Sequence, residues 1–238
     1  MKPLFTSGHA RVFAMTGALA FAVSMLYAAY VYGVTFSHVT SASSAARPLA
    51  IDVALFAVFA LHHSIFARAG LKQRVRAWAG PDAERSVYVW IASVLFVLML
   101  AGWQPVPGLL WRATGLLAWL LPVLPLMGLA LMVGAGRFTD VRDLAGLRGP
   151  DASASRPIAS VSSRGPYAVI RHPLYLAFLL LLWPMRDMTH TRLLFAALFT
   201  VYVVVAIPLE ERDLRRAFGD AYERYAKRVR YRLVPGVY

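Results

Sequence analysis

Long apolar runs constrain this chain more than any other feature of its sequence. Six such runs lie near residues 12–34, 49–67, 86–103, 114–134, 173–185 and 191–208. Because a helix needs about 20 apolar residues to cross the hydrocarbon core of a bilayer, these runs predict membrane spans. The fifth run is short and ends at Trp183-Pro184, so we expect it to form a tight helical hairpin with the sixth. The predicted fold is an all-α, polytopic membrane helical bundle with about six transmembrane helices.

The composition agrees with this fold and narrows the class of partner. The 238 residues are 59% hydrophobic and only 16% charged, which is far more apolar than a soluble domain. Cysteine is absent, so a disulfide framework and a thiolate metal site are excluded, and we predict no metal. The net charge of +13 would suit nucleic acid, but the basic residues lie between apolar runs, where anionic lipid explains them better. We therefore predict membrane lipid, and no nucleic acid, as a partner.

The basic residues also predict an orientation. Of the 25 Lys and Arg residues, 21 lie before the first run, in the second and fourth loops, or after the sixth run. The positive-inside rule places these segments, and hence both termini, in the cytoplasm. No internal repeat is visible, so we expect a single membrane domain over 1–238.

The tail that follows the sixth run differs from the rest of the chain. Five apolar or aromatic residues recur there at helical spacing, opposite a face of Arg and Lys: Leu214, Phe218, Tyr222, Tyr225 and Val229. This pattern predicts a C-terminal amphipathic cytosolic helix, which either lies on lipid or covers a cytosolic pocket. Gly219 interrupts the pattern, and Asp220 with Glu223 is predicted to cap the helix where it restarts.

The fifth run begins in an unusual way, with the sequence RGPYAVIRHPLYLAF at 164–178. Proline favours the first position of a helix and disfavours helical geometry in the residue before it, so His172 is predicted to cap a helix that starts at Pro173. The free N–H groups of that first turn, together with Arg171, form a candidate anion site. The alternative is an ordinary basic flank beside an interfacial Tyr167.

Two adjacent carboxylates, Glu210 and Glu211, follow the sixth run directly. Neighbouring carboxylates at a membrane boundary repel each other and are costly to desolvate, so they need cationic partners. The predicted hairpin brings them next to the R-H-P junction. The residues expected to converge are Arg171, His172, Tyr175, Glu210, Glu211, Tyr222, Tyr225 and Arg228. Such a pocket suits a nucleotide that carries both positive and negative charge.

These motifs, RGPYAVIRHPLYLAF and then EERDLRRAFGDAYERYAKRV, resemble the isoprenylcysteine carboxyl methyltransferase superfamily of integral membrane enzymes. The resemblance implies S-adenosylmethionine bound between the R-H-P junction and the C-terminal helix, in a cofactor-binding core at 164–238 behind a four-helix part at 1–134. The cofactor contacts that it implies are Tyr167, Arg171, His172, Tyr175, Glu210, Glu211, Tyr222, Tyr225 and Arg228.

The front of the chain is similar to one branch of that superfamily. LHHSIFARAGLK (61–72), ERSVYV (84–89) and WQP (103–105) resemble the methanethiol S-methyltransferases. This resemblance implies a bacterial inner-membrane enzyme that methylates a small thiol, such as methanethiol, to give dimethyl sulfide. A thiol reacts as its thiolate, so a base is desirable, and His63 is the predicted one. Glu84 and Arg85 are predicted either to line the acceptor entrance or to pair with each other.

The sequence also allows other functions. Ala177 and Arg230 depart from the superfamily pattern, and GRFTDVRDLAGLRG (136–149) matches the thiol branch only in part. The acceptor is then alternatively an isoprenylcysteine, a phospholipid or another lipophilic molecule. Membrane proteins associated with nitric-oxide reductase share part of the front pattern and are a non-catalytic alternative. A transporter is disfavoured because the ionisable residues gather at one boundary and not at mid-bilayer. A sterol-reductase type of enzyme would use NADPH.

Overall fold

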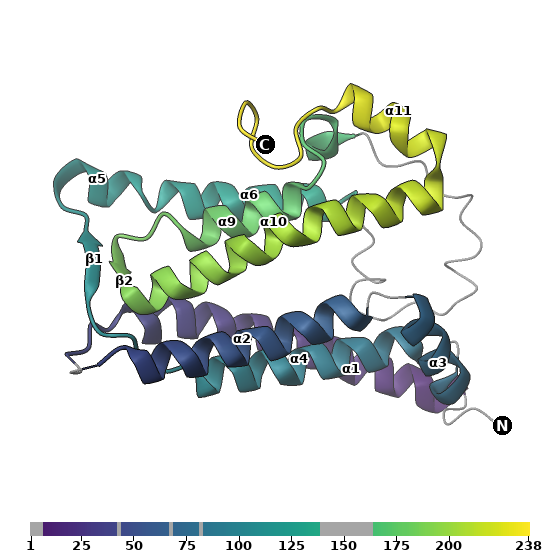
Figure 1. Ribbon diagram of the computed structural model, residues 1–238, viewed down its shortest axis with the longest axis horizontal. Coiled ribbons are helices and arrows are strands. Elements are labelled where there is room, and N and C mark those ends of the chain that lie inside the picture. The colour runs from purple at the N-terminus through teal and green to yellow at the C-terminus, as the bar shows by residue number, and fades with distance from the viewer. Residues whose placement is uncertain (1–6, 42–43, 67–68, 81–82, 139–163) are drawn as a thin grey trace. The chain divides into compact units, whose positions relative to one another are not determined.

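A computed structural model describes residues 7–41, 44–66, 69–80, 83–138 and 164–238 of the chain. The described residues form two compact units (Figure 1). The first lies within Met1–Pro107, and the second lies within Gly108–Asp140 and Pro157–Tyr238.

The first unit is a helical bundle. Its elements are α1 (Ser7–Gly33), η1 (Thr35–Ser37), α2 (Ala46–Phe66), α3 (Ala69–Ala79) and α4 (Glu84–Gly102). Helix α4 packs against α1, where the Trp90 ring stacks on Phe13 and its Nε1 donates to the Phe13 carbonyl at 3.1 Å. At the other end of α4, the backbone N–H of Gln104 donates to the fully buried carboxylate of Asp52 at 2.8 Å. This bond ties α2 to the segment that follows α4.

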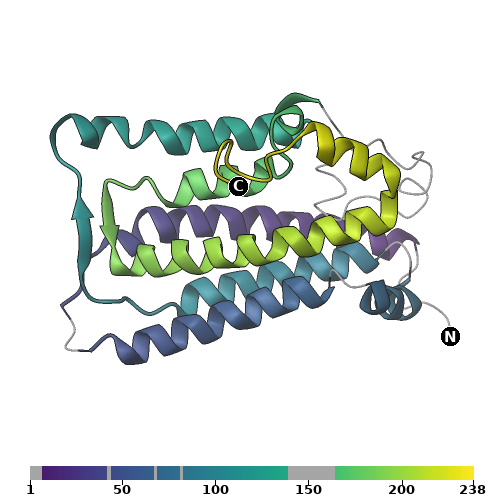
Figure 2. The ribbon, with the colours of Figure 1, turned by 45° about the horizontal axis from the view of Figure 1, so that its top comes forward.

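The second unit contains β1 (Leu109–Arg112), α5 (Gly115–Leu120), α6 (Val123–Gly136), η2 (Gly165–Ala168), α9 (Pro173–Leu182), β2 (Asp187–Thr189), α10 (His190–Phe218) and α11 (Asp220–Arg228). Figure 2 shows α9 between α6 and α10. Helices α6 and α9 approach closely at Gly128, where an added Cβ would lie 2.8 Å from the carbonyl oxygen of Ala177. Small residues at this crossing therefore permit close backbone packing within the membrane.

Among the described residues, five stretches are long and apolar enough to cross a membrane: Gly8–Ser37, Ala46–Phe66, Glu84–Gly102, Gly115–Gly136 and His190–Phe218. They correspond to five of the six predicted runs and confirm a polytopic helical membrane protein. The sixth full span is not confirmed, because α9 has only 10 residues. Such a helix rises about 15 Å, half of the hydrocarbon thickness.

The chain beyond α9 joins a small two-stranded sheet. After α9, the chain reaches β2, which pairs antiparallel with β1 just ahead of α5. Asp187 of β2 lies opposite Arg112 of β1, and their side chains form an ion pair at 3.1 Å. Strand β2 thus forms backbone hydrogen bonds with β1. These bonds satisfy N–H and C=O groups that lipid cannot satisfy.

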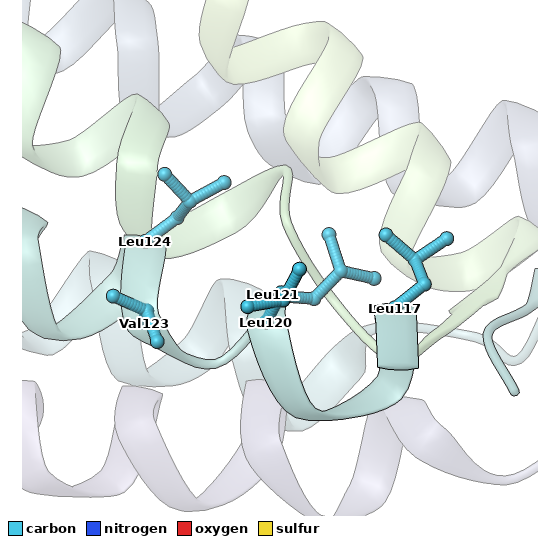
Figure 3. Close-up of a pocket in the computed structure, with 5 residues that line it drawn as sticks. All are labelled: Leu117, Leu120, Leu121, Val123 and Leu124. Carbon is cyan, nitrogen blue, oxygen red and sulfur yellow. The ribbon is translucent and has the colours of Figure 1, made fainter. Parts of the chain in front are cut away.

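Many large apolar side chains of the helices are exposed, as expected for surfaces that face lipid. Trp119 is 81% exposed and Leu116 is 73% exposed. An open recess of about 280 Å³ lies at the break between α5 and α6. Figure 3 shows its lining residues, which are Leu117, Leu120, Leu121, Val123 and Leu124. Its lining is aliphatic, so it suits acyl chains and not a charged nucleotide.

Candidate active site

Two helix ends build the candidate site in the second unit. Helix α9 begins at Pro173 with His172 as its N-cap residue, as the sequence predicts. Helix α10 does not stop at Pro208 but continues to Phe218, so Glu210, Glu211 and Arg215 lie on one unbroken helix. The first turn of α9 and the last turns of α10 therefore present their polar side chains to each other.

The chain that follows α11 completes this arrangement. Ile170 and Tyr231 form a short parallel bridge. Beside it, the N–H of Arg171 donates to the Tyr231 carbonyl at 3.0 Å, and the N–H of His172 donates to the Arg232 carbonyl at 2.9 Å. These backbone bonds fix the R-H-P junction and bring Arg232 to it.

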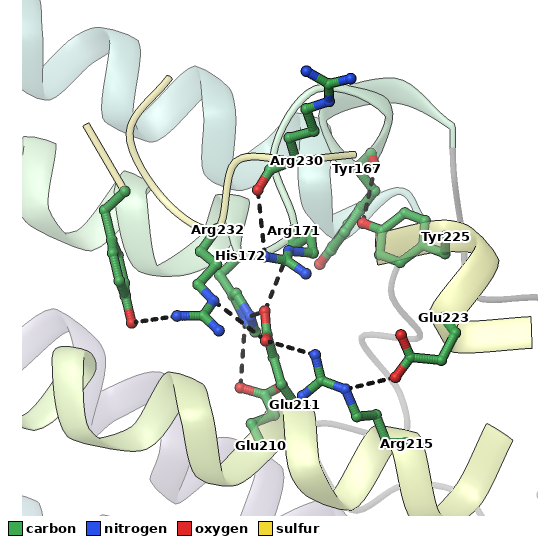
Figure 4. Close-up of polar contacts among 11 residues, drawn as sticks. Tyr167, Arg171, His172, Glu210, Glu211, Arg215, Glu223, Tyr225, Arg230 and Arg232 are labelled. Carbon is green, nitrogen blue, oxygen red and sulfur yellow. Dashed lines mark hydrogen bonds and ion pairs between the residues drawn. The ribbon is translucent and has the colours of Figure 1, made fainter. Parts of the chain in front are cut away.

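Glu211 is the centre of the polar cluster (Figure 4) and is fully buried. Its Oε1 lies 3.2 Å from Arg171 Nε and 3.4 Å from His172 Nε2. Its Oε2 lies 3.3 Å from Arg232 Nε and 3.6 Å from Arg215 Nη2. A buried carboxylate requires such partners, because desolvation of an unpaired charge is costly. The expected meeting of Arg171 with Glu211 is confirmed, and three arginines surround one carboxylate.

The neighbouring Glu210 has a different environment. Its side chain is 46% exposed. The Tyr175 hydroxyl donates to its Oε2 at 3.0 Å, and His172 Nδ1 lies 3.6 Å from the same oxygen. The His172 ring also stacks on Tyr175 with 5.6 Å between ring centroids. His172 thus lies between two carboxylates, one buried and one open to solvent.

Helix α11 packs its apolar face inside the protein. Tyr222, Tyr225 and Val229 are buried in one cluster with Leu214 and Phe218. These are the five residues predicted to share a face. Their burial favours a helix that covers the site over one whose apolar face lies in lipid.

The two buried tyrosines of α11 have different hydroxyl environments. The Tyr225 hydroxyl donates to the Tyr167 carbonyl at 3.0 Å. Burial raises the pKa of Tyr225 to about 12, so its hydroxyl stays protonated and remains a donor at neutral pH. The guanidinium of Arg215 lies over the Tyr222 ring, 5.5 Å from its centroid. The buried Tyr222 hydroxyl has no hydrogen-bond partner among the described residues, which makes it available to a ligand.

The predicted catalytic residues lie in the first unit. His63 of α2 has its Nδ1 2.5 Å from the Tyr88 hydroxyl of α4. Arg85 lies over the Tyr88 ring, 5.9 Å from its centroid. The Glu84 carboxylate lies 3.7 Å from Arg76 Nε. The catalytic roles of His63, Glu84 and Arg85 stay predictions.

Comparison with known proteins places the chain in a family. The profile of the family described as NnrU protein matches residues 52–236. The chain belongs to the NnrU protein family. This NnrU family member is 34% identical over 226 residues to methanethiol S-methyltransferase 2 of Bradyrhizobium diazoefficiens, with 92% of the chain and 87% of the relative covered.

Two further relatives of the chain carry the same enzyme name. Methanethiol S-methyltransferase of Pseudomonas deceptionensis is 35% identical, covering 80% of the chain and 75% of the relative. The enzyme of that name from Mycobacterium tuberculosis is 33% identical, covering 77% of each. No solved structure is significantly similar to the chain. The predicted similarity to the methanethiol S-methyltransferases is thus confirmed.

Two arginines of the site were not predicted from the sequence, Arg215 and Arg232. Arg215 had a local signal, because it stands four residues after Glu211 on a helix, where an ion pair is favoured. Arg232 had none, since the bridge between Ile170 and Tyr231 brings it in from a segment without helical pattern. By contrast, the predicted Arg228 is exposed near the end of α11.

The predicted cap at the start of α11 is wrong. The N-cap residue is Gly219, at φ 49°, and no side chain caps the helix. Instead, Glu223 accepts a hydrogen bond from Arg215 Nε at 2.8 Å. A charge-assisted bond to a guanidinium is stronger than a bond to a neutral N–H, so Glu223 links α11 to α10.

Proposed function

We propose that this protein is an integral membrane methyltransferase that transfers a methyl group from S-adenosylmethionine to a small thiol, with methanethiol as the leading acceptor. The observation that carries the proposal is the buried contact between Arg171 and Glu211 at 3.2 Å. This contact unites, in one polar site, the two separate stretches that resemble the methyltransferase superfamily. The names of the relatives from Bradyrhizobium, Pseudomonas and Mycobacterium support the thiol acceptor.

The chemistry of the site fits S-adenosylmethionine. The amino acid part of this cofactor carries a carboxylate and an ammonium group. Arg171, Arg215 and Arg232 supply more positive charge than Glu211 neutralises, which leaves donors for a ligand carboxylate. Glu210, with its half-exposed side chain, is the carboxylate available to a ligand cation.

Unsatisfied atoms in the site also favour a ligand. Within the described residues, the buried Tyr222 hydroxyl and Glu211 Oε2 lack a well-oriented hydrogen bond. Buried polar atoms of this kind are rare unless something else binds them. We assign the aromatic side chains of Tyr167, Tyr175 and Tyr225, with His172, to the nucleoside part. Arg228 is assigned to the solvent-exposed edge of the site.

Each group of residues has a defined task in the reaction. Bound S-adenosylmethionine supplies an electrophilic methyl group on a positively charged sulfur. The buried cluster around Glu211 positions the cofactor and keeps water out, which favours a displacement that neutralises charge. His63 accepts the thiol proton, and its bond with Tyr88 at 2.5 Å fixes the orientation of the ring. Glu84 and Arg85 are assigned to the acceptor side of the reaction.

We further propose that the protein lies in a bacterial inner membrane with both termini in the cytoplasm. The asymmetric distribution of its 25 Lys and Arg residues supports this orientation. It places the Glu211 cluster where cytosolic S-adenosylmethionine has access, while a small lipophilic thiol arrives from the cytosol or the bilayer.

The test is a calorimetric titration of the purified, detergent-solubilised protein with S-adenosylhomocysteine and, separately, with NADPH. We expect saturable binding of the former and none of the latter. Cells that express the protein and are fed methanethiol are expected to release dimethyl sulfide. Binding of NADPH alone would favour a reductase, and binding of neither nucleotide would refute the catalytic proposal.

A further inference from the structure

A small closed loop follows the segment that delivers Arg232. The N–H groups of Leu233 and Val234 donate to the Tyr238 carbonyl at 2.9 and 3.2 Å, and the N–H of Tyr238 donates back to the Val234 carbonyl at 3.0 Å. The loop turns at Gly236, whose φ of 82° lies in the left-handed region that glycine adopts without strain. These bonds fix residue 238 next to residues 233 and 234.

The Tyr238 side chain has contacts on two sides. It packs on a core cluster formed by Val203 and Ile207 of α10 with Leu233. It also meets Arg232, whose guanidinium lies 5.3 Å from the ring centroid and whose Nη1 donates to the Tyr238 hydroxyl at 3.2 Å. The same guanidinium faces Glu211 through Nε at 3.3 Å. Tyr238 therefore contacts Arg232 on the guanidinium atoms that Glu211 leaves free.

Two of the arginines around Glu211 differ in how their side chains are held. The Arg171 side chain is 9% exposed, and its Nη2 also donates to the Arg230 carbonyl at 3.3 Å. The Arg232 side chain is 33% exposed. A long, partly exposed side chain loses conformational entropy when it pairs, which cancels much of the gain from an ion pair. Arg232 therefore needs a second partner to hold the rotamer that faces Glu211.

We infer that Tyr238 is a positioning residue for the cofactor site: through its hydrogen bond and ring contact it holds Arg232 against Glu211. This inference rests on the proposed function, because the site it serves is the proposed S-adenosylmethionine site. Tyr238 touches Arg232 and not the buried carboxylate, so it acts through another residue.

The experiment removes only the Tyr238 hydroxyl. Tyr238→Phe keeps the ring on its core cluster and over the guanidinium but deletes the bond to Nη1. We expect the Kd for S-adenosylhomocysteine of the full-length protein to rise about fivefold, as for the net contribution of one ordinary hydrogen bond. The thermal midpoint of the ligand-free protein is expected to stay that of the wild type. Tyr30→Phe on α1, where the side chain is 58% exposed, is the matched control and should change neither quantity.

A second background separates positioning from general structure. In an Arg232→Gln protein, Tyr238→Phe is expected to cause no further loss of affinity, because the residue through which it acts is gone. An equal loss in both backgrounds, or an unchanged Kd in Tyr238→Phe alone, overturns the inference while leaving the proposed function intact.

A ligand-free measurement decides the inference even if the wild type fails to bind S-adenosylhomocysteine, a failure that would refute the proposed function. The N–H groups of Arg171 and His172 donate to carbonyls of the segment that carries Arg232. The ion pair of Arg232 with Glu211 anchors this segment, so loss of the Arg232 rotamer in Tyr238→Phe should make these two amides exchange with deuterium faster than in the wild type. Equal exchange rates would contradict the positioning role.

Discussion

Arg171 and Glu211 form a buried ion pair, with Nε and Oε1 3.2 Å apart, although one precedes α9 and the other lies far along α10. The pair is possible because α10 continues beyond Pro208 without a break and α9 starts at a proline. Arg215 and Arg232 complete the shell around the carboxylate. Glu211 is thus a buried anion, whereas its neighbour Glu210 is half exposed. Substitution of Glu211 should therefore affect mainly stability, and substitution of Glu210 mainly ligand binding.

Glu211→Gln is expected to destabilise the protein strongly. The substitution leaves three arginines without their shared buried counter-charge, and breaking a buried pair in this way costs about 3–5 kcal/mol of unfolding free energy. Thermal or chemical unfolding in detergent measures the loss. A variant as stable as the wild type would show that Glu211 is not the electrostatic centre of the cluster.

Glu210→Gln separates binding from folding. Because the Glu210 side chain is 46% exposed, its loss should change the unfolding free energy by less than about 1 kcal/mol. Affinity for S-adenosylhomocysteine should nevertheless fall, since Glu210 is the carboxylate assigned to the ligand cation. An unchanged Kd would remove Glu210 from the site.

The tyrosines of α11 predict how stability depends on alkaline pH. Burial raises the pKa of Tyr225 from 10.0 to about 12, so the unfolded chain loses this proton first as the pH rises. Stability should therefore be insensitive to this group below its unfolded pKa and should fall between pH 10.0 and about 12. Tyr225→Phe should make the decline in unfolding free energy less steep, and an identical slope would contradict the assignment.

The absence of cysteine makes the predicted orientation easy to test. Leu110→Cys lies on β1, and Arg224→Cys lies on the exposed face of α11. In intact spheroplasts, a membrane-impermeant maleimide should label Leu110→Cys and should reach Arg224→Cys only after permeabilisation. The reverse labelling pattern would place the Glu211 cluster on the periplasmic side.

His63→Ala tests the proposed base. Loss of a general base lowers the rate of its step by about 10²–10⁴-fold, whereas the affinity for S-adenosylhomocysteine should remain. Tyr88→Phe should give a smaller loss, because it removes only the bond that orients the ring. His38→Ala, which replaces an exposed histidine after η1, is the control. If His63→Ala methylates the thiol at the wild-type rate, His63 is not the base.

The sequence predicts local features of this fold well. Five membrane helices follow from the length and hydropathy of their runs. The His172 cap follows from the restriction that Pro173 imposes, and the buried face of α11 follows from helical periodicity. Each depends on residues that are close in the chain, where steric and hydrophobic patterns act directly.

The non-local features were harder to predict. The pairing of β1 with β2 and the bridge between Ile170 and Tyr231 join segments that are far apart in sequence and show no alternating pattern. The early end of α9 and the position of Arg232 beside Glu211 go together with these pairings. Glu223 was misassigned because Arg215 competes for it with the helix cap.

The central claim is methyl transfer from S-adenosylmethionine to a thiol at the site that Arg171 and Glu211 build. The most direct test incubates the purified wild-type protein and Glu210→Gln with methanethiol and S-adenosylmethionine bearing a trideuterated methyl group, followed by mass spectrometry of the headspace. The wild type is predicted to release trideuterated dimethyl sulfide and the variant much less. A folded wild-type protein that releases no labelled dimethyl sulfide would contradict the account.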